Sequence, residues 1–159
     1  MPAPEVVRPP VLLSGEAGII TGERPRSTEL IVPATPVAAW NVAKRVYQAI
    51  DIPVTVENPA GHQLGNNSFA KTRTLGGMRM SELVDCGSGM TGRKADTYRI
   101  LMSLMTVIDP DPKGVRLRTM LVAYGQDMGG DSTERIACGT TGLLELTVNN
   151  SIRDNLPKP

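Results

Sequence analysis

The sequence predicts an α+β fold, with an antiparallel sheet of about five to six strands and two helices packed on one face. Two segments, about 36–50 and about 143–156, carry apolar residues three or four positions apart, which is the spacing of a helix. Most of the strand-like stretches lie consecutively between them and are separated by turn-forming residues. Consecutive strands flanked by helices are typical of an antiparallel sheet with its helices on one side.

Composition excludes several classes of protein. The chain has 159 residues, of which 40% are hydrophobic and 21% charged, so we expect one globular domain with a core. A formal net charge of +1 and an aromatic content of 3% give no basis for a nucleic-acid partner. Since His62 is the only histidine and no Cys-x-x-Cys spacing occurs, we expect neither a metal site nor a cofactor. No apolar run approaches the ~18 residues of a transmembrane segment.

Residues 1–26 are predicted to form an extended arm outside a single α+β domain of residues 27–159. The arm is rich in proline, glycine and charged residues, and its short apolar piece Val11-Leu12-Leu13 has no periodic partner nearby. A segment of this composition becomes ordered only when the domain's own surface or a partner holds it. We therefore regard Val11, Leu12 and Leu13 as candidate interaction residues.

The first strand and the first helix are predicted within residues 27–50. Ser27–Val32 is a β-branched and aliphatic run that Pro33 ends. Thr35 followed by Pro36 is the pattern of a helix N-cap with proline in the first turn. We expect the buried face of this helix to consist of Val37, Trp40, Ala43, Tyr47 and Ile50.

Three strands are predicted to follow this helix. They are Ile52–Glu57, Gln63–Thr74 and Met78–Val84, with a turn at 58–61 and a break at Gly76-Gly77. The middle one alternates Phe69 with small and polar residues, so we expect one of its faces to be in contact with water.

The next two strands are predicted to form an antiparallel hairpin. Thr97–Ile108 is apolar on both faces and Val115–Tyr124 alternates, while residues 109–114 are turn formers and are expected to make the connecting loop. Three arginines are predicted to line one face of this hairpin, Arg99, Arg116 and Arg118. Recognition of an acidic partner by these arginines is the functional alternative to a plain solvated face.

The chain is predicted to close with a helix over about 143–156. Leu144, Val148, Ile152 and Leu156 form its apolar stripe, and Pro157 ends it. Thr140 or Thr141 is expected to cap its start.

The only two cysteines, Cys86 and Cys138, each stand where an apolar run gives way to a glycine-rich turn. We predict that they form a disulfide, which would tie the start of the closing helix to the sheet and would persist only in an oxidising compartment. Two buried thiols, or a redox or catalytic thiol, are the alternatives. With one distant histidine, no Cys–His pair can be assembled from the sequence.

The turns at 86–89 and 138–142 are expected to serve as plain turns and helix caps. Anion binding is the alternative, and the second turn is the better candidate because it precedes a helix. Both lack the lysine of a P-loop. No histidine and no characteristic spacing make a catalytic set out of the neighbouring polar residues Asp85, Ser88, Lys94 and Asp96. We therefore predict that the protein is not an enzyme.

Several motifs carry a resemblance. The chain contains Leu30-Ile-Val-Pro-Ala-Thr-Pro-x-x-Ala-Trp40, Val46-Tyr47-x-x-Ile50-Asp-Ile-Pro-Val54-Thr-Val and Gly65-Asn-x-x-Phe69. It also contains Val84-Asp-Cys-Gly-Ser-Gly89, Ala95-Asp-Thr-Tyr98 and Cys138-Gly-x-Thr-Gly142. In these motifs it resembles small uncharacterised envelope lipoproteins of gemmatimonad-type bacteria. More distantly, the strand, the Ala-Trp helix and the hairpin look like the helix-grip modules of the outer-membrane lipoprotein BamC.

The resemblance implies an extracytoplasmic, disulfide-bonded accessory domain without catalysis. No lipobox cysteine precedes the arm, so lipid anchoring is not expected. We therefore expect a periplasmic or envelope-associated interaction module that docks by its arm and sheet surface on a protein partner in a membrane-associated complex, with a photosynthetic complex as one candidate. A cytoplasmic location is the alternative. A carrier holding a small apolar ligand between helix and sheet is the second hypothesis for function.

Overall fold

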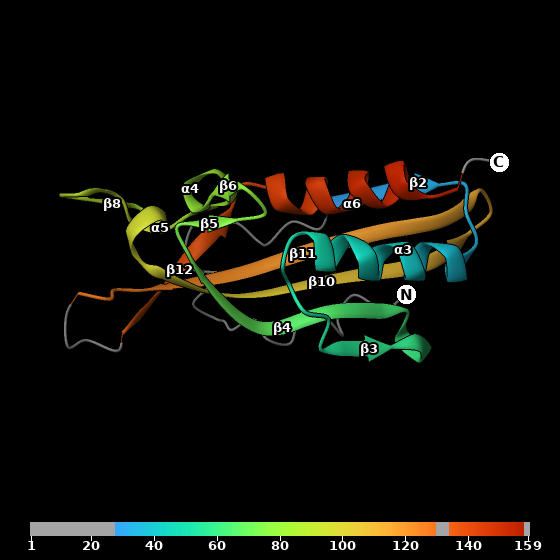
Figure 1. Cartoon of the computed structure of the whole chain (residues 1–159), viewed down its shortest axis with the longest axis horizontal. Coiled ribbons are helices and arrows are strands. Elements are labelled where there is room, and N and C mark those ends of the chain that lie inside the picture. The colour runs from blue at the N-terminus through green and yellow to red at the C-terminus, as the bar shows by residue number, and fades with distance from the viewer. Residues whose placement is uncertain (1–27, 130–133, 158–159) are drawn as a thin grey trace.

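A long hairpin forms the centre of the structure, a computed structural model that describes residues 28–129 and 134–157. Strand β10 (Arg99–Asp111) pairs antiparallel with β11 (Gly114–Gln126), and Figure 1 shows the two running along most of the molecule. The hairpin is confirmed, but the predicted loop 109–114 is wrong. Pairing continues to the end, with Asp111 opposite Gly114, so Pro112 and Lys113 alone make the turn.

Five more strands complete a seven-stranded, wholly antiparallel sheet. On one side of the hairpin lie β4 (Gln63–Thr72) and β3 (Val56–Asn58). On the other side β11 pairs with β2 (Thr28–Val32) near the turn and with β12 (Arg135–Thr140) near the opposite end. Strand β7 (Val84–Asp85) then pairs with β12. The predicted α+β class with its antiparallel sheet is confirmed.

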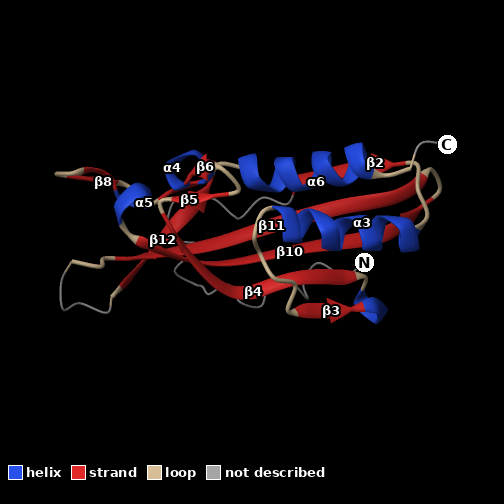
Figure 2. Cartoon of the chain, in the orientation of Figure 1, coloured by secondary structure: helices blue, strands red, loops and turns tan. Residues whose placement is uncertain are grey.

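Helices α3 (Pro36–Ala49) and α6 (Leu143–Asn155) cover one face of this sheet (Figure 2). Tyr47 of α3 and Asn149 of α6 reach the hydroxyls of Thr106 and Thr119, which are directly opposite each other on β10 and β11. Both helices therefore lie on the same side of the hairpin. The Thr35 hydroxyl accepts a 3.1 Å hydrogen bond from the amide of Ala38, so the predicted N-cap of α3 is present.

The buried face of α3 differs from the predicted one. Val42 and Val46 are buried, whereas Val37 is 70% exposed and Trp40 is only half-buried. The reason is that α3 packs against α6 as well as against the sheet, which turns its buried stripe by about one position. On α6 the predicted stripe is buried throughout.

The start of α6 also differs in detail. Gly142 precedes the helix in the left-handed backbone region with φ 90°, so neither threonine is the N-cap. Instead, Thr141 Oγ1 accepts a hydrogen bond from the amide of Leu143, and Thr140 Oγ1 accepts one from the amide of Gly142.

Residues 74–97 form a small lobe at one end of the hairpin (Figure 1). It contains two short ribbons, β5 (Thr74–Leu75) with β6 (Met78–Arg79) and β8 (Ser88–Gly89) with β9 (Gly92–Arg93). Between and after them come α4 (Met80–Leu83) and α5 (Lys94–Thr97).

The predicted strand Met78–Val84 is therefore wrong over most of its length. The Glu82 carboxylate accepts a 3.1 Å hydrogen bond from the amide of Arg79, which satisfies a donor at the start of α4 and favours one helical turn there.

Two further features of the sheet differ from the prediction. The predicted strand Ile52–Glu57 is paired only from Val56, because the preceding segment is held by isolated contacts such as Asn66 Nδ2 to the Pro53 carbonyl at 2.8 Å. Strand β12 was not predicted at all. The first turn after β3 is a 3-10 helix at Pro59–Gly61.

One continuous apolar core joins the sheet, both helices and the lobe. A second, smaller cluster consists of Met105 and Val107 with the partly buried Val56 and Met120. It lies on the other side of the sheet, because these hairpin residues alternate with Thr106 and Thr119.

Candidate functional site

The sheet face that points away from α3 and α6, called here the outer face, is the candidate functional site. The register aligns its side chains in rows across the strands. In one row Val107 lies between Gln63 of β4 and Arg118 of β11, and in the next Met105 is opposite Met120. The apolar side chains that the hairpin contributes to this face, called here the apolar strip, are Leu101, Met105, Val107, Met120 and Val122.

Ion pairs occupy the end of the outer face near the hairpin turn. Arg118 donates to Asp109 Oδ2 at 3.0 Å, and Asp109 Oδ1 is 3.3 Å from His62 Nδ1. Arg116 donates to Asp111 Oδ2 at 3.1 Å. Each of these arginines therefore already has a carboxylate partner within the sheet. This weakens the prediction that they recognise an acidic partner, because such a partner would have to displace an aspartate.

Arg99 is not part of this charged cluster. It is opposite Gln126, at the other end of the hairpin from Arg116, which is opposite Asp109. Ten residues separate Arg99 from Asp109, a distance of about 33 Å along a strand. The structure thus brings two of the three predicted arginines together and leaves the third apart. The other predicted interaction residues, Val11, Leu12 and Leu13, lie outside the described residues.

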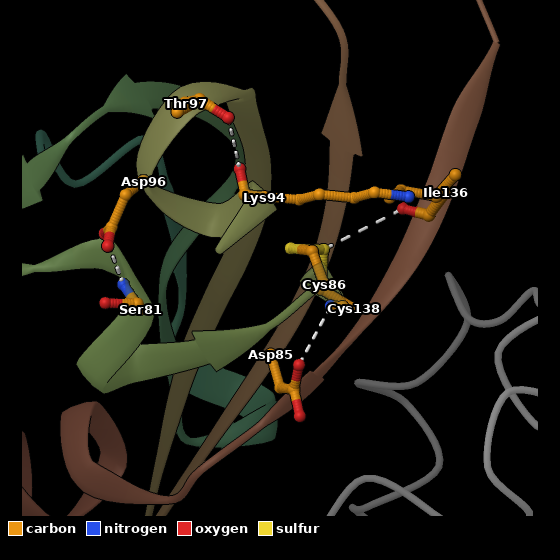
Figure 3. Close-up of a disulfide and its surroundings, with 9 residues drawn as sticks. Ser81, Asp85, Cys86, Lys94, Asp96, Thr97, Ile136 and Cys138 are labelled. Atoms are coloured by element: carbon orange, nitrogen blue, oxygen red, sulfur yellow. Dashed lines mark hydrogen bonds between the residues drawn. A yellow bond between two sulfur atoms is a disulfide. The ribbon is translucent and has the colours of Figure 1, made fainter. Parts of the chain in front are cut away.

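The two cysteines meet at the junction of the lobe and the sheet. Cys86 follows β7 and Cys138 belongs to β12, and the structure joins them in a disulfide that spans 52 positions of sequence (Figure 3). The single proton of the Thr141 hydroxyl is directed at the Glu82 carbonyl at 2.7 Å, with the Leu83 carbonyl at 3.1 Å, and this contact holds the same junction. The pair is consistent with an oxidising compartment.

Polar side chains around the disulfide serve the local fold. The Asp85 carboxylate accepts from the amide of Gly87, and the Asp96 carboxylate accepts from the amide of Ser81, both at 2.9 Å (Figure 3). The Lys94 ammonium lies 5.9 Å from the centre of the Tyr98 ring, within range of a cation–π contact. These groups do not converge on one point as a catalytic set would.

The turn before α6 has an acidic neighbour that opposes anion binding. Thr140 Oγ1 lies 2.8 and 3.0 Å from the two carboxylate oxygens of Glu145, a fully buried residue in the first turn of the helix. Burial raises the pKa of Glu145 from 4.5 to about 7, and its hydrogen bonds, including that from Thr140, lower it in part. Apart from its place in the first helical turn, nothing in the sequence marks Glu145 as a residue of interest.

Four side chains form a buried polar chain beneath the helices. It runs from the Tyr47 hydroxyl through Thr106 and Thr119 to the Asn149 amide, with distances of 2.9, 3.0 and 2.6 Å. Burial raises the pKa of Tyr47 well above its ordinary value, more than its hydrogen bond to Thr106 lowers it. Sequence reasoning missed this chain. Its signal was the two threonines within otherwise apolar stretches.

A groove of about 300 Å³ lies between the two long helices. It is lined by helix and helix-end residues alone, namely Val42, Arg45, Val46, Ala49, Ile50, Ser151 and Asn155. Since several of these are exposed, the groove opens to solvent and does not reach the sheet.

Among the described residues, no group of three or more histidine, cysteine, aspartate or glutamate side chains is placed to hold a metal ion. Within the same residues, no helix is both long and apolar enough to cross a membrane. Comparisons of the chain with protein-family models, with curated proteins and with solved structures found no match. Fold and site therefore define an α+β protein with a disulfide-bonded lobe and an open sheet face.

Proposed function

We propose that this chain is a non-enzymatic, extracytoplasmic interaction module that docks by its N-terminal arm and outer face on a protein partner in a membrane-associated complex. The observation that carries the proposal is the outer face itself. Three apolar side chains of the hairpin on this face, Leu101, Met120 and Val122, are half-buried, while no described helix lies on that side. Apolar area of this kind, bordered by ion pairs, is typical of a protein-binding surface.

The exposed part of this surface extends to the edge strand β2. Ile31 is opposite Arg116, so its side chain belongs to the outer face, where it is 45% exposed. Arg116 and Asp111 border it with a mutually neutralised pair. The surface thus favours a partner whose contact area is apolar at the centre and polar at the rim.

The disulfide supports an extracytoplasmic location, because such bonds persist in oxidising compartments. The resemblance to envelope lipoproteins and to helix-grip modules agrees with a periplasmic or envelope-associated site of action. A photosynthetic complex stays one candidate for the assembly.

The carrier hypothesis has less support. It needs space for an apolar ligand between helix and sheet, yet Tyr47, Thr106, Thr119 and Asn149 fill that interface and hydrogen-bond across it. The groove between the helices offers a place for a ligand, but it lies outside the interface of helix and sheet that the carrier hypothesis requires.

Affinity purification from cells that express the chain natively tests the docking proposal. The comparison is between Ile31→Glu on the outer face and Val37→Glu, which is also an exposed apolar position but lies on α3. We expect the membrane-complex subunits recovered with the wild type to be lost with Ile31→Glu and retained with Val37→Glu. Equal recovery with both variants, or recovery of no subunit with the wild type, would contradict the proposal.

A further inference from the structure

Part of the apolar strip is buried on a side of the sheet where no described helix lies. Val107 is 1% exposed and Met105 6%, and their neighbours in the rows, Gln63 and Arg118, are 5% and 9% exposed. Both α3 and α6 pack on the opposite face, at Thr106 and Thr119. Something must pack over the apolar side chains on this side to bury them, because the sheet itself shields a side chain from water only on the side of its backbone.

Two buried donors beside Val107 also need a partner. Gln63 Nε2 and Arg118 Nε are buried, and neither has a hydrogen-bond acceptor among residues 28–129 and 134–157. They lie on the two strands that flank Val107, so they border the same spot of the outer face. A buried donor without an acceptor destabilises the folded state, so an acceptor placed over this spot would be stabilising.

Residues 1–27 of the chain have the composition that fits this face. Their proline-rich backbone keeps its carbonyl acceptors while each proline lacks a donor. Their charges cancel, with three acidic residues (Glu5, Glu16, Glu23) against three basic ones (Arg8, Arg24, Arg26). Near the hairpin turn the arginines and aspartates of the outer face are likewise paired with one another, so a segment without net charge that carries apolar side chains is complementary to this region.

The point of attachment also fits. Thr28 is opposite Thr119, whose chain neighbours Arg118 and Met120 belong to the outer face. The 15 Cα–Cα steps from Leu13 to Thr28 reach about 50 Å when extended, and the strip from Leu101 to Val107 is about 20 Å long. A segment tethered this closely has an effective concentration on the order of millimolar at the face.

We propose that the outer face is the docking site of the chain's own residues 1–27, with Val11, Leu12 and Leu13 packed on the apolar strip. This inference deepens the proposed function, because arm and sheet then form one composite surface that a partner contacts. The use of that surface in docking rests on the proposed function. The cover itself needs no partner, so it can be tested on the purified chain.

Methionine oxidation of the purified full chain by hydrogen peroxide, mapped by mass spectrometry, tests the cover. The oxidation rates of Met105 and Met120 report on the cover of the strip. Met90 is fully exposed and its rate reports on the activity of the reagent, whereas Met102 is buried on the helix face and its rate reports on whether the protein stays folded. In the variant Val11→Asp, Leu12→Asp, Leu13→Asp we expect Met105 and Met120 to oxidise on the order of tenfold faster, since no opening of a cover is then required. Met90 and Met102 should be unchanged.

The matched control adds the same three charges to polar or glycine positions of the arm, as Ser14→Asp, Thr21→Asp and Gly22→Asp, and should oxidise like the wild type. Unchanged rates at Met105 and Met120 in the first variant would overturn the proposal. So would protection that disappears on dilution of the wild type, which would assign the cover to a second copy. If Met102 also becomes reactive, the triple variant is no longer fully folded. The oxidation rates of Met105 and Met120 are then compared between the wild type and the milder variant Leu12→Ser.

The oxidation experiment contains no partner protein. If it fails, the docking proposal is still supported by the exposed Ile31 side chain of the outer face. Loss of docking with an intact cover would in turn refute only the proposed function.

Discussion

The Thr119 hydroxyl donates a 2.6 Å hydrogen bond to the side-chain oxygen of Asn149, whose amide nitrogen donates to the Thr28 carbonyl. This fixes the direction of the whole buried chain. Thr119 has a single proton, so Thr106 must donate to Thr119 and Tyr47 must donate to Thr106. The chain ties α3, α6 and three strands to one another.

The direction predicts unequal effects of two similar substitutions. Thr119→Val leaves Asn149 without its donor and Thr106 without its acceptor, so the free energy of unfolding should fall by about 2–3 kcal/mol. Tyr47→Phe removes the first donor and leaves no buried donor unpaired, so it should cost about 1 kcal/mol. Urea unfolding of both variants measures the difference. A larger loss for Tyr47→Phe would show that the direction is reversed.

Glu145 predicts a pH dependence of stability. Its pKa is about 7 in the folded protein and 4.5 unfolded, so between these values the folded state binds more protons. Stability is therefore unaffected by this group below pH 4.5 and falls as the pH rises through 7, by about 3 kcal/mol in total.

Glu145→Gln should remove this dependence, because the amide oxygen still accepts from Thr140 and carries no charge. Urea midpoints at pH 5 and pH 8 give the comparison, with the half-exposed Glu57→Gln as control. If the wild type and Glu145→Gln lose stability in parallel, Glu145 titrates normally and the account of its burial is wrong.

The disulfide predicts a large loss on reduction. In the chain-entropy model, opening a bridge across 52 positions lowers the free energy of unfolding by about 4 kcal/mol. The double variant Cys86→Ser, Cys138→Ser should show the same loss without reductant. Thiol titration of native material should find no free thiol. Two titratable thiols in protein taken from its native compartment would refute the oxidising location.

Gly114 predicts a steric requirement at the hairpin turn. A Cβ there would lie 2.1 Å from the Val32 carbonyl oxygen and 2.8 Å from Pro33 Cα, at φ 136°. Gly77 has φ 82° but nothing within 4 Å, so Gly77→Ala isolates the backbone cost of about 1 kcal/mol. Gly114→Ala should cost about 3 kcal/mol or more, because it also displaces the connection from β2 to α3. Similar melting temperatures for the two variants would contradict this.

The elements that sequence reasoning placed correctly are those with strong local signals. The Thr35-Pro36 start of α3, the apolar stripe of α6 and the alternation of β11 each specify one structure. The prediction for residues 109–114 was wrong because turn-forming residues are typical of a loop. In the sheet, two aspartates of this stretch pair with Arg116 and Arg118 and extend the strands.

The candidate site was less accessible to sequence reasoning, because it depends on register. Nothing local places Gln63 beside Val107, or Arg99 far from Arg116. The burial of Glu145 depends on the docking of α6 against β12, and a charged residue in a first helical turn ordinarily predicts exposure.

Site-specific photo-crosslinking in cells that express the chain natively tests the central claim most directly. A photoreactive residue replaces Ile31 on the outer face in one variant and Val37 on α3 in the other, both exposed apolar positions. The account predicts an adduct with a subunit of a membrane-associated complex from position 31 and none from position 37. An adduct from position 37 alone, or from neither, would contradict docking through the outer face.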